Sequence, residues 1–490
     1  MFSAKNGEKK MSWEWREHDR AKVLSCLQEG EYEAIVTSRE GALDSLAHLA
    51  TELGVLDAVR LLEVEREREG IPDELLLRTA CLLPFIEAAG LSAASESLFA
   101  DASILLQIGY TALEIQTGFN ERHGAKQTEK KGEAIPCHPD VLRNELLRVK
   151  GESLVAFRQE CIRRLQQRGL IKGKIYAVDG SGIGKRWRLV GLYNVHKGRK
   201  LWLSWRLLSG EASEKGKEGQ VLFEMVDEVR QIMGETAIEW ILMDALYADG
   251  PLLAGLKYGR GIEALVRLPE DRIMYGDLWF LLQVEPERWQ IHQDVSYIAG
   301  HKQLRQIRVG TVPELNRWHS FVQAAATYGE PAPTLWGCGI HCRNQTDPTQ
   351  PVQAWALIST APFASGWSAY TFWRQRWHIE DDGFRELKEG WLLEKAPWSY
   401  TQEALVQARV TFTLIAYNVA EIAKTANGRR LTNHGIRRLR RHLNREVGHA
   451  PVIVFAAGAY GIFDIEEVMT ALGKPPLHSL RRHAVPIHSP

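Results

Sequence analysis

The stretch that decides the fold covers residues 175–208 and has the sequence IYAVDGSGIGKRWRLVGLYNVHKGRKLWLSWRLL. It begins with a short buried strand, residues 175–178, which ends at Asp179 and is followed by a glycine-rich run. Two further strand-like runs, residues 189–195 and 201–208, are joined by a short turn-forming segment. We therefore expect three consecutive antiparallel strands at the start of a sheet.

The segments that follow alternate between helix and strand. Apolar spacing predicts a helix over residues 219–233, a strand over 238–243 that ends at Asp244, a helix over 251–258 and a strand over 262–268. Alternation of this kind is typical of a parallel or mixed sheet. Three strands, a helix, a strand, a helix and a strand is the order of the RNase H-like fold, so we predict an α/β core of that type.

The rest of the chain differs from this core in its pattern. Residues 41–170 place apolar side chains at threes and fours, which predicts helices, whereas three β-like pieces (277–284, 303–312 and 320–326) follow the core. A long amphipathic helix is expected over 368–389. We therefore expect five regions: a helical N-terminal domain (1–170), the first part of the core (171–268), a β-rich insertion (269–354), the second part of the core (355–425) and a basic C-terminal region (426–490).

Composition indicates a folded protein of more than one domain. The 490 residues are 45% hydrophobic and 25% charged, as in ordinary globular proteins. The longest apolar run, residues 451–463, is shorter than the ~20 residues that cross a bilayer, and the N-terminus has no secretory pattern. The six cysteines form no CxxC pair, so we expect reduced thiols. We predict a cytoplasmic protein with no membrane contact.

Positive charge is concentrated in two places, although Lys plus Arg and Asp plus Glu balance at 61 each. Residues 425–490 hold ten basic and four acidic side chains, most densely at 437–441, and a second basic cluster surrounds Asp179. Either cluster alone is explained by a solvated surface. Cations beside a carboxylate also suit a site that admits a polyanion. The second cluster comprises Lys172, Lys174, Lys185, Arg186, Arg188, Lys197, Arg199, Lys200 and Arg206.

Two aspartates stand where α/β sheets place their ligands. Asp179 and Asp244 each follow a predicted core strand. A single aspartate in such a place is more often a helix cap or a turn residue. An acid from the helix over residues 368–389 would make three carboxylates, which are enough to hold two Mg²⁺ ions about 3.5–4 Å apart for phosphodiester chemistry. The pattern therefore predicts a two-metal site.

The third acid lies in a segment that resembles a known family. Residues 373–388, WRQRWHIEDDGFRELK, resemble the Tyr-Arg-Glu-Lys signature of DDE insertion-sequence transposases of the "insertion sequence four" type group. Trp373 stands in the tyrosine position, and Arg376 and Glu380 follow at the usual spacing. The lysine comes eight residues after Glu380 where seven is usual, and one extra residue turns a side chain by about 100° around an α-helix. Asp381 would restore that spacing, but Arg376 would then leave the acid's face, so we prefer Glu380 and keep Asp381 as the alternative.

The resemblance reaches Asp179 and Asp244 and covers most of the chain. It implies a transposase that moves an insertion sequence by cut-and-paste, with Mg²⁺ (or Mn²⁺) held by Asp179, Asp244 and Glu380, and with 3′-OH strand transfer after cleavage. The implied partners are the terminal inverted repeats, target DNA and a second copy of the chain on nucleoid DNA, with the helical N-terminal domain used for DNA binding or assembly. The residues expected to contact DNA are Arg376, Lys388, Trp373, Lys185, Arg186, Arg437, Arg438, Arg440 and Arg441.

The same family often stacks a flipped base on a tryptophan of the insertion. Four tryptophans of this chain lie in residues 269–354 and are candidates for that role. They are Trp279, Trp289, Trp318 and Trp336.

Other interpretations stay open at this stage. An RNase H-like nuclease would share the three acids, and a decayed or domesticated transposase would bind DNA without cutting it. Residues 180–185, GSGIGK, resemble a phosphate-binding loop, but Lys185 stands where the third small residue belongs, so we expect no nucleotide cofactor. Residues 338–342, CGIHC, lack a second pair at zinc-finger spacing, so we expect no zinc.

Overall fold

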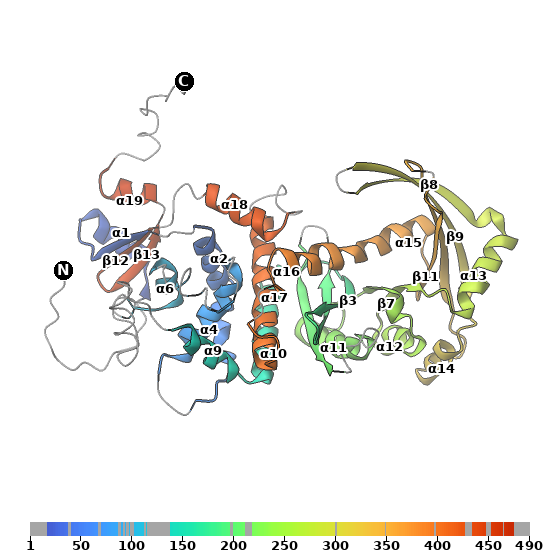
Figure 1. Ribbon diagram of the computed structural model, residues 1–490, viewed down its shortest axis with the longest axis horizontal. Coiled ribbons are helices and arrows are strands. Elements are labelled where there is room, and N and C mark those ends of the chain that lie inside the picture. The colour runs from blue at the N-terminus through green and yellow to red at the C-terminus, as the bar shows by residue number, and fades with distance from the viewer. Residues whose placement is uncertain are drawn as a thin grey trace, which may run out of the picture. The chain divides into compact units, whose positions relative to one another are not determined.

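The computed structural model divides the chain into two compact units, residues 1–164 with 388–490 and residues 165–387. Figure 1 shows the elements of both. No helix of the described residues is long and apolar enough to cross a membrane. The structure describes residues 17–474, apart from 38–40, 67–69, 87–89, 92–93, 95–97, 99–101, 112–113, 115–137, 197–198, 211–217, 299–300, 348, 396–397, 427–433, 447–451 and 464.

The unit of residues 165–387 is built on one mixed sheet of nine strands, in the order β5-β4-β3-β6-β7-β11-β10-β9-β8. The three antiparallel strands predicted at its start are confirmed as β3, β4 and β5. Strands β6 and β7 then run parallel to β3, and β11 is antiparallel to β7. The α/β class is therefore confirmed. The strands are β3 (Ile175–Ile183), β4 (Trp187–Asn194), β5 (Trp202–Ser209), β6 (Trp240–Met243), β7 (Glu263–Leu268), β8 (Trp289–Ile298), β9 (His301–Leu315), β10 (Leu335–Asn344) and β11 (Gln353–Ser359).

Helices cover both faces of this sheet. The predicted helices before β6 and β7 are found as α11 (Leu222–Met233) and α12 (Gly250–Arg260), which pack on β4, β5 and β7. Figure 1 shows the segment that begins with α15 (Gly366–Trp373) on the other side of these strands. The long helix expected over 368–389 is not one α-helix. It continues from α15 through a 3₁₀ turn (Arg374–Arg376) and a π-helix (Ile379–Phe384) into α16 (Arg385–Glu389).

Residues 269–354 extend the sheet and do not form a separate β subdomain, because β11 bonds directly to β7 and β10, β9 and β8 follow. Two pieces expected as β are helices: α13 (Ile273–Val284) and α14 (His319–Thr327). In α13, Met274, Leu278 and Leu282 recur every four residues and are buried, a helical period that its many aromatic residues concealed. The alanines of α14 are strong helix formers.

The other unit joins the two ends of the chain. The described residues between 41 and 167 are mainly helical, as the apolar spacing predicted, and a four-stranded sheet of order β1-β13-β12-β2 pairs N-terminal with C-terminal strands. Strands β12 and β13 of the C-terminal region therefore fold with the N-terminal strands β1 and β2. The elements are β1 (Glu17–His18), α1 (Arg20–Gln28), β2 (Ala34–Thr37), α2 (Gly41–Glu52), α3 (Val55–Ala58), α4 (Asp73–Leu82), α6 (Ala102–Ile108), α9 (Pro139–Leu147), α10 (Gly151–Gln167), α17 (Glu403–Ala426), α18 (Ile436–Glu446), β12 (Val452–Ala456), β13 (Ala459–Phe463) and α19 (Ile465–Ala471).

Candidate active site

Two adjacent parallel strands bring Asp179 and Asp244 to the same part of the sheet. Ala177 of β3 is the register partner of Leu242 of β6, so Asp244 is level with Asp179 on strands about 4.8 Å apart. Asp244 begins a 3₁₀ turn, yet its side chain makes no capping hydrogen bond there. The side chain of Asp249, by contrast, caps α12. Helix capping therefore accounts for Asp249 and does not account for Asp244.

Strand β3 does not end at Asp179 as expected but continues to Ile183, paired with β4. Asp179 accepts a hydrogen bond of 2.7 Å on Oδ1 from the backbone N–H of Gly180. The turn between β3 and β4 exposes Lys185 and Arg186. The hairpin that carries Asp179 therefore also carries two exposed cations at its tip.

A buried arginine links Asp179 to Glu380. Arg376 Nη1 lies 3.2 Å from Asp179 Oδ2 and 2.5 Å from Glu380 Oε1. The guanidinium is also within 5.3 Å of the Trp373 ring centroid and 5.7 Å of the Trp377 ring centroid. The 3₁₀ turn that holds Arg376 packs against β3 and β6, and Arg376 is only 3% exposed. The structure thus brings the predicted third acid beside the first.

The electrostatics of Asp179 show an excess of negative charge. Burial, together with the negative charges of Glu380 and Asp244, raises the pKa of this carboxyl to about 6. The Gly180 N–H and the positive charge of Arg376 act in the opposite direction but do not prevail. Asp179 is therefore a buried carboxylate that one arginine does not fully neutralise.

Asp179, Asp244 and Glu380 supply carboxylate oxygens, the donors that Mg²⁺ prefers. The raised pKa of Asp179 fits such a cation, since added positive charge would favour its ionised form. Within the part of the chain that the structure describes, no three His, Cys, Asp or Glu side chains are already gathered around a position for an ion. Instead, the guanidinium of Arg376 contacts two of the three acids. The donor chemistry fits Mg²⁺, with Arg376 as the cation now present.

The two alternatives for the third acid occupy different surroundings. Asp381 is 51% exposed in its side chain, and its Oδ1 pairs at 3.2 Å with Arg385. Glu380 instead points to the Arg376 guanidinium that also binds Asp179. The geometry therefore favours Glu380 over Asp381.

Sequence analysis missed a second polar cluster next to this acid. Asp382 accepts from His378 Nδ1 at 2.7 Å and pairs with Lys200 Nζ at 2.5 Å. These partners lower the pKa of Asp382 to about 2, although burial acts to raise it. The only signal in the sequence was the i, i+4 spacing of His378 and Asp382, because Lys200 lies 182 residues before Asp382.

The π-helix that contains Glu380 is held by aromatic packing. A Cβ atom on Gly383 would lie 2.8 Å from Cζ2 of Trp202, which is fully buried on β5. The rings of Trp202 and Phe384 are 5.0 Å apart between centroids. Glycine is therefore required where this turn meets the sheet.

The residues expected to contact DNA are distributed unevenly. Trp373 is 4% exposed, and its ring N–H donates to the Met243 carbonyl at 3.2 Å, so it belongs to the core. Lys388 lies in the other compact unit, where its Nζ is 3.6 Å from Glu394 Oε2. Lys197, Arg429, Arg430, Arg481 and Arg482, from the two basic clusters, lie outside the described residues.

Helix α18 carries four of the expected arginines, three of them exposed on a face away from its buried residues and one, Arg440, half-buried. Ile436, Leu439 and Leu443 are buried, whereas Arg437, Arg438 and Arg441 are exposed. Two of the arginines also bond within the unit: Arg437 donates to the Glu389 carbonyl at 2.9 Å, and Arg440 donates to the Pro84 carbonyl at 3.2 Å. Arg440 therefore has a structural contact in addition to its charge.

The glycine-rich run of residues 180–185 is part of β3 and its turn. A phosphate-binding loop requires a helix that begins directly after it, and no helix begins there. Cys338 and Cys342 are buried, and burial raises the pKa of both thiols. His341 stacks on two tryptophan rings. The two cysteines are therefore part of the packed interior, and His341 belongs to a separate aromatic cluster.

No model of a known protein family matches the chain, and no curated protein matches it.

Proposed function

We propose that this protein is a DDE-type DNA transposase that cuts the ends of an insertion sequence and joins them to target DNA. The observation that carries the proposal is the position of Arg376, whose Nη1 contacts both Asp179 and Glu380 in the segment that resembles the family signature. Asp244, level with Asp179 on the neighbouring strand, provides the third carboxylate.

The arrangement of the sheet supports an RNase H-like core. Three antiparallel strands are followed by two parallel ones in the order β5-β4-β3-β6-β7. In such sheets, ligands bind beyond the carboxyl ends of parallel strands. Asp244 directly follows β6, and Asp179 is level with it on β3, just past the part of β3 that pairs with β6. The third acid comes from the helical segment that packs against β3.

We assign the ion-binding role to Asp179, Asp244 and Glu380. Two Mg²⁺ ions, or Mn²⁺ in their place, would supply activation of the attacking oxygen and stabilisation of the leaving oxygen. Within the protein, the Gly180 N–H fixes one oxygen of Asp179, and Arg376 holds the carboxylates of Asp179 and Glu380 close together. In keeping with the resemblance, we propose that this guanidinium, which is buried between the two acids here, binds a phosphate oxygen when DNA enters.

We propose that exposed cations contact DNA in each unit, taken by itself. Lys185 and Arg186 lie at the tip of the hairpin that carries Asp179, and Arg438 and Arg441 lie on the exposed face of α18. Lys388 is proposed to contact DNA in keeping with the family signature. Pairing of two element ends favours a homodimer on double-stranded DNA, in the cytoplasm with the nucleoid.

Cleavage of a labelled duplex taken from either end of the DNA segment that encodes the chain tests this proposal. Wild-type protein with Mg²⁺ is expected to nick that duplex and to join the freed 3′ end to a target. Glu380→Gln is expected to abolish both reactions, whereas the exposed Asp381→Asn is the matched control and should retain them. Binding of the duplex without cleavage by the wild type, with Mg²⁺ or Mn²⁺, would contradict the catalytic proposal.

A further inference from the structure

Tyr247 places a buried hydroxyl beside the proposed carboxylate site. It ends the 3₁₀ turn that follows Asp244, and its backbone N–H donates to the Asp244 carbonyl at 3.0 Å. Tyr247 is only 1% exposed, and its hydroxyl has no hydrogen-bond partner among the residues that the structure describes. Such groups are rare in folded proteins, because leaving a buried hydroxyl unpaired lowers stability. The hydroxyl therefore needs an explanation beyond packing.

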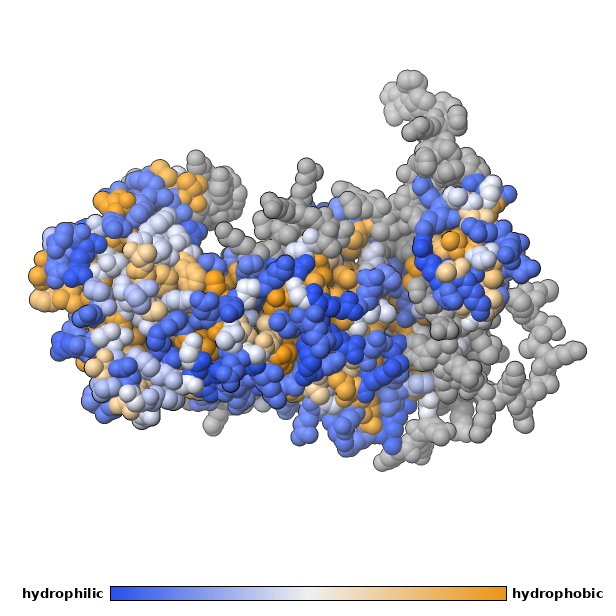
Figure 2. All heavy atoms as spheres, turned by 180° about the vertical axis from the view of Figure 1, so that it is seen from behind, coloured by the Kyte–Doolittle hydropathy of each residue, from blue (hydrophilic) through white to orange (hydrophobic). Residues whose placement is uncertain are grey.

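The turn exposes its apolar side chain and buries its polar one. Leu246 is 39% exposed, although its neighbour Tyr247 is enclosed. Hydrophobic residues occupy only separate patches of the mainly hydrophilic face that Figure 2 shows. A leucine in the buried position would remove apolar area from water and would leave no hydroxyl unpaired. Apolar packing alone therefore does not explain the choice of tyrosine at this position.

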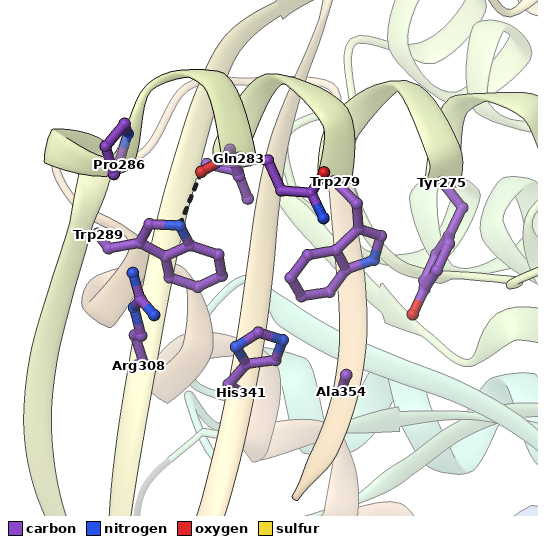
Figure 3. A pocket seen from close by; sticks show the side chains of 9 residues that line it. Tyr275, Trp279, Gln283, Pro286, Trp289, Arg308, His341 and Ala354 are labelled. Carbon is purple, nitrogen blue, oxygen red and sulfur yellow. Dashed lines mark hydrogen bonds between the residues drawn. The ribbon is translucent and has the colours of Figure 1, made fainter.

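Two aromatic N–H groups of the same unit show how the fold satisfies comparable donors. The ring N–H of Trp289 donates to the Leu282 carbonyl at 2.9 Å, the bond drawn in Figure 3. The ring N–H of Trp373 donates to the Met243 carbonyl at 3.2 Å. The backbone thus supplies an acceptor to each of these donors, whereas the hydroxyl of Tyr247 has none among the described residues.

The charges around the Tyr247 hydroxyl are mainly negative. Burial, together with the charges of Asp179, Glu218 and Asp244, raises the pKa of this hydroxyl well above its usual value, whereas the charge of Arg188 acts to lower it. Among these charges, that of Asp179 has the largest effect. The hydroxyl therefore keeps its proton at neutral pH and can donate to a carboxylate.

Glu218 lies close to both Tyr247 and Asp179 and has an arginine of its own. The 3₁₀ turn that begins at Glu218 packs against the turn of Tyr247. A Cβ atom on Gly180, the residue after Asp179, would lie 2.6 Å from Cγ of Glu218. The buried Glu218 pairs with Arg188, whose Nε lies 2.5 Å from its Oε1. Asp179, which Arg376 does not fully neutralise, is therefore the better acceptor for the hydroxyl.

We propose that Tyr247 is a positioning residue for Asp179, whose carboxylate accepts a hydrogen bond from the Tyr247 hydroxyl when the site holds a divalent cation. This inference rests on the proposed function, which assigns the cation to Asp179, Asp244 and Glu380. Carboxylates that bind a metal ion are in turn held by hydrogen bonds from neighbouring groups. In this structure Oδ2 of Asp179 contacts Arg376 instead, and the hydroxyl of Tyr247 is unpaired.

Tyr247→Phe in the full chain tests this role, because it removes the hydroxyl and keeps the ring. In EDTA, the urea midpoint of the variant should not fall below that of the wild type, since no hydrogen bond is lost. Binding of Mn²⁺, followed by electron paramagnetic resonance without DNA, should weaken about tenfold, as when a group that supports a metal ligand is removed.

Tyr176→Phe is the matched control. This tyrosine of β3 is fully buried and lies three residues before Asp179, so it points to the opposite face of the sheet. The change removes a buried hydroxyl away from the carboxylates and should leave the affinity for Mn²⁺ unchanged.

Three results would overturn the role of Tyr247. The first is a lower urea midpoint of Tyr247→Phe in EDTA, which would mean that the hydroxyl has a partner without the ion. The second is an unchanged Mn²⁺ affinity in this variant, and the third is an equal loss of affinity in Tyr176→Phe.

The same measurements separate this inference from the proposed function. If Tyr247→Phe weakens Mn²⁺ binding but the wild type does not cut the DNA ends, the proposed function fails alone. If the wild type cuts them but Tyr247→Phe binds Mn²⁺ as the wild type does, this inference fails alone. A wild type that binds no Mn²⁺ would overturn both.

Discussion

Replacing Asp179 by asparagine should make the protein relatively more stable as the pH rises, which is the opposite of what the loss of an ordinary ion-paired acid does. The pKa of Asp179 is raised from 3.8 to about 6 in the folded protein. The folded state then binds more protons than the unfolded state between those values, so wild-type stability falls as pH rises through them. At 1.36 kcal/mol per pH unit, the unfavourable contribution reaches about 3 kcal/mol near pH 7.

Asp179→Asn removes this ionisation, so the variant does not lose this stability as the pH rises. The unfolding free energy of the variant minus that of the wild type should therefore increase by about 3 kcal/mol from pH 4 to pH 7. Urea denaturation followed by tryptophan fluorescence, at a series of pH values, measures it. Comparing the shift across pH cancels the constant effect of losing the contact with Arg376. Asp381→Asn, at an exposed carboxylate paired with Arg385, is the control and should show no such shift.

Mg²⁺ provides a second measurement on the same pair of proteins. If Asp179 helps to hold the ion, Mg²⁺ should reduce the loss of wild-type stability above pH 6 and should affect Asp179→Asn much less. If the unfolding free energies of the wild type and Asp179→Asn differ by the same amount at every pH, the pKa of Asp179 is not raised by folding, and its description as a buried, incompletely neutralised carboxylate is wrong.

Two further changes test the packing and the proposed DNA surface. Gly383→Ala places a Cβ atom 2.8 Å from the buried Trp202 and should lower the unfolding free energy, measured in urea, by about 1–3 kcal/mol. The control is Gly276→Ala on α13, where the added Cβ atom meets open space and should not be destabilising. Equal effects of the two changes would contradict the packing of the π-helix. Arg438→Ala should weaken duplex binding and lower its salt dependence by about one ion without changing stability, whereas Arg440→Ala should also lower stability by about 1 kcal/mol, since it bonds the Pro84 carbonyl. Titrations at several salt concentrations and urea denaturation decide between them, and unchanged duplex affinity in Arg438→Ala would remove α18 from the proposed DNA surface.

The relative positions of Asp179, Asp244 and Glu380 could be predicted because their sequence signals are local, whereas their role as a metal site stays a prediction. Asp179 and Asp244 are close because each belongs to one of two strands whose apolar runs are plain in the sequence, and parallel pairing makes them level. Arg376 and Glu380 are four residues apart, so helical geometry alone puts them on one side. These inferences needed no knowledge of how distant segments pack.

Other features could not be predicted because they depend on distant partners. The pairing of Lys200 with Asp382 joins residues 182 apart. The C-terminal strands β12 and β13 find their partners in the N-terminal strands β1 and β2, which no spacing in the sequence reveals. Helix α13 looked like a strand because its aromatic residues are typical of sheets. The close approach of Leu278 and Leu282 to Gly310, Gly337 and Gly339 on the strands beneath it could not be read from the sequence.

Lys388 follows Glu380 by eight residues, where the signature that this segment resembles has seven, and the added residue has a physical location in this structure. An extra residue in an α-helix would turn everything after it by about 100°. Here the segment that begins at Ile379 is a π-helix, in which each hydrogen bond spans five residues and not four, so the turn takes up an added residue. Glu380 lies at the start of that turn, and its partner Arg376 precedes the turn, so the added residue does not separate the two. The added residue is accommodated where Gly383 meets Trp202. Because π-turns often mark functional sites, the irregular spacing is compatible with the proposed carboxylate site.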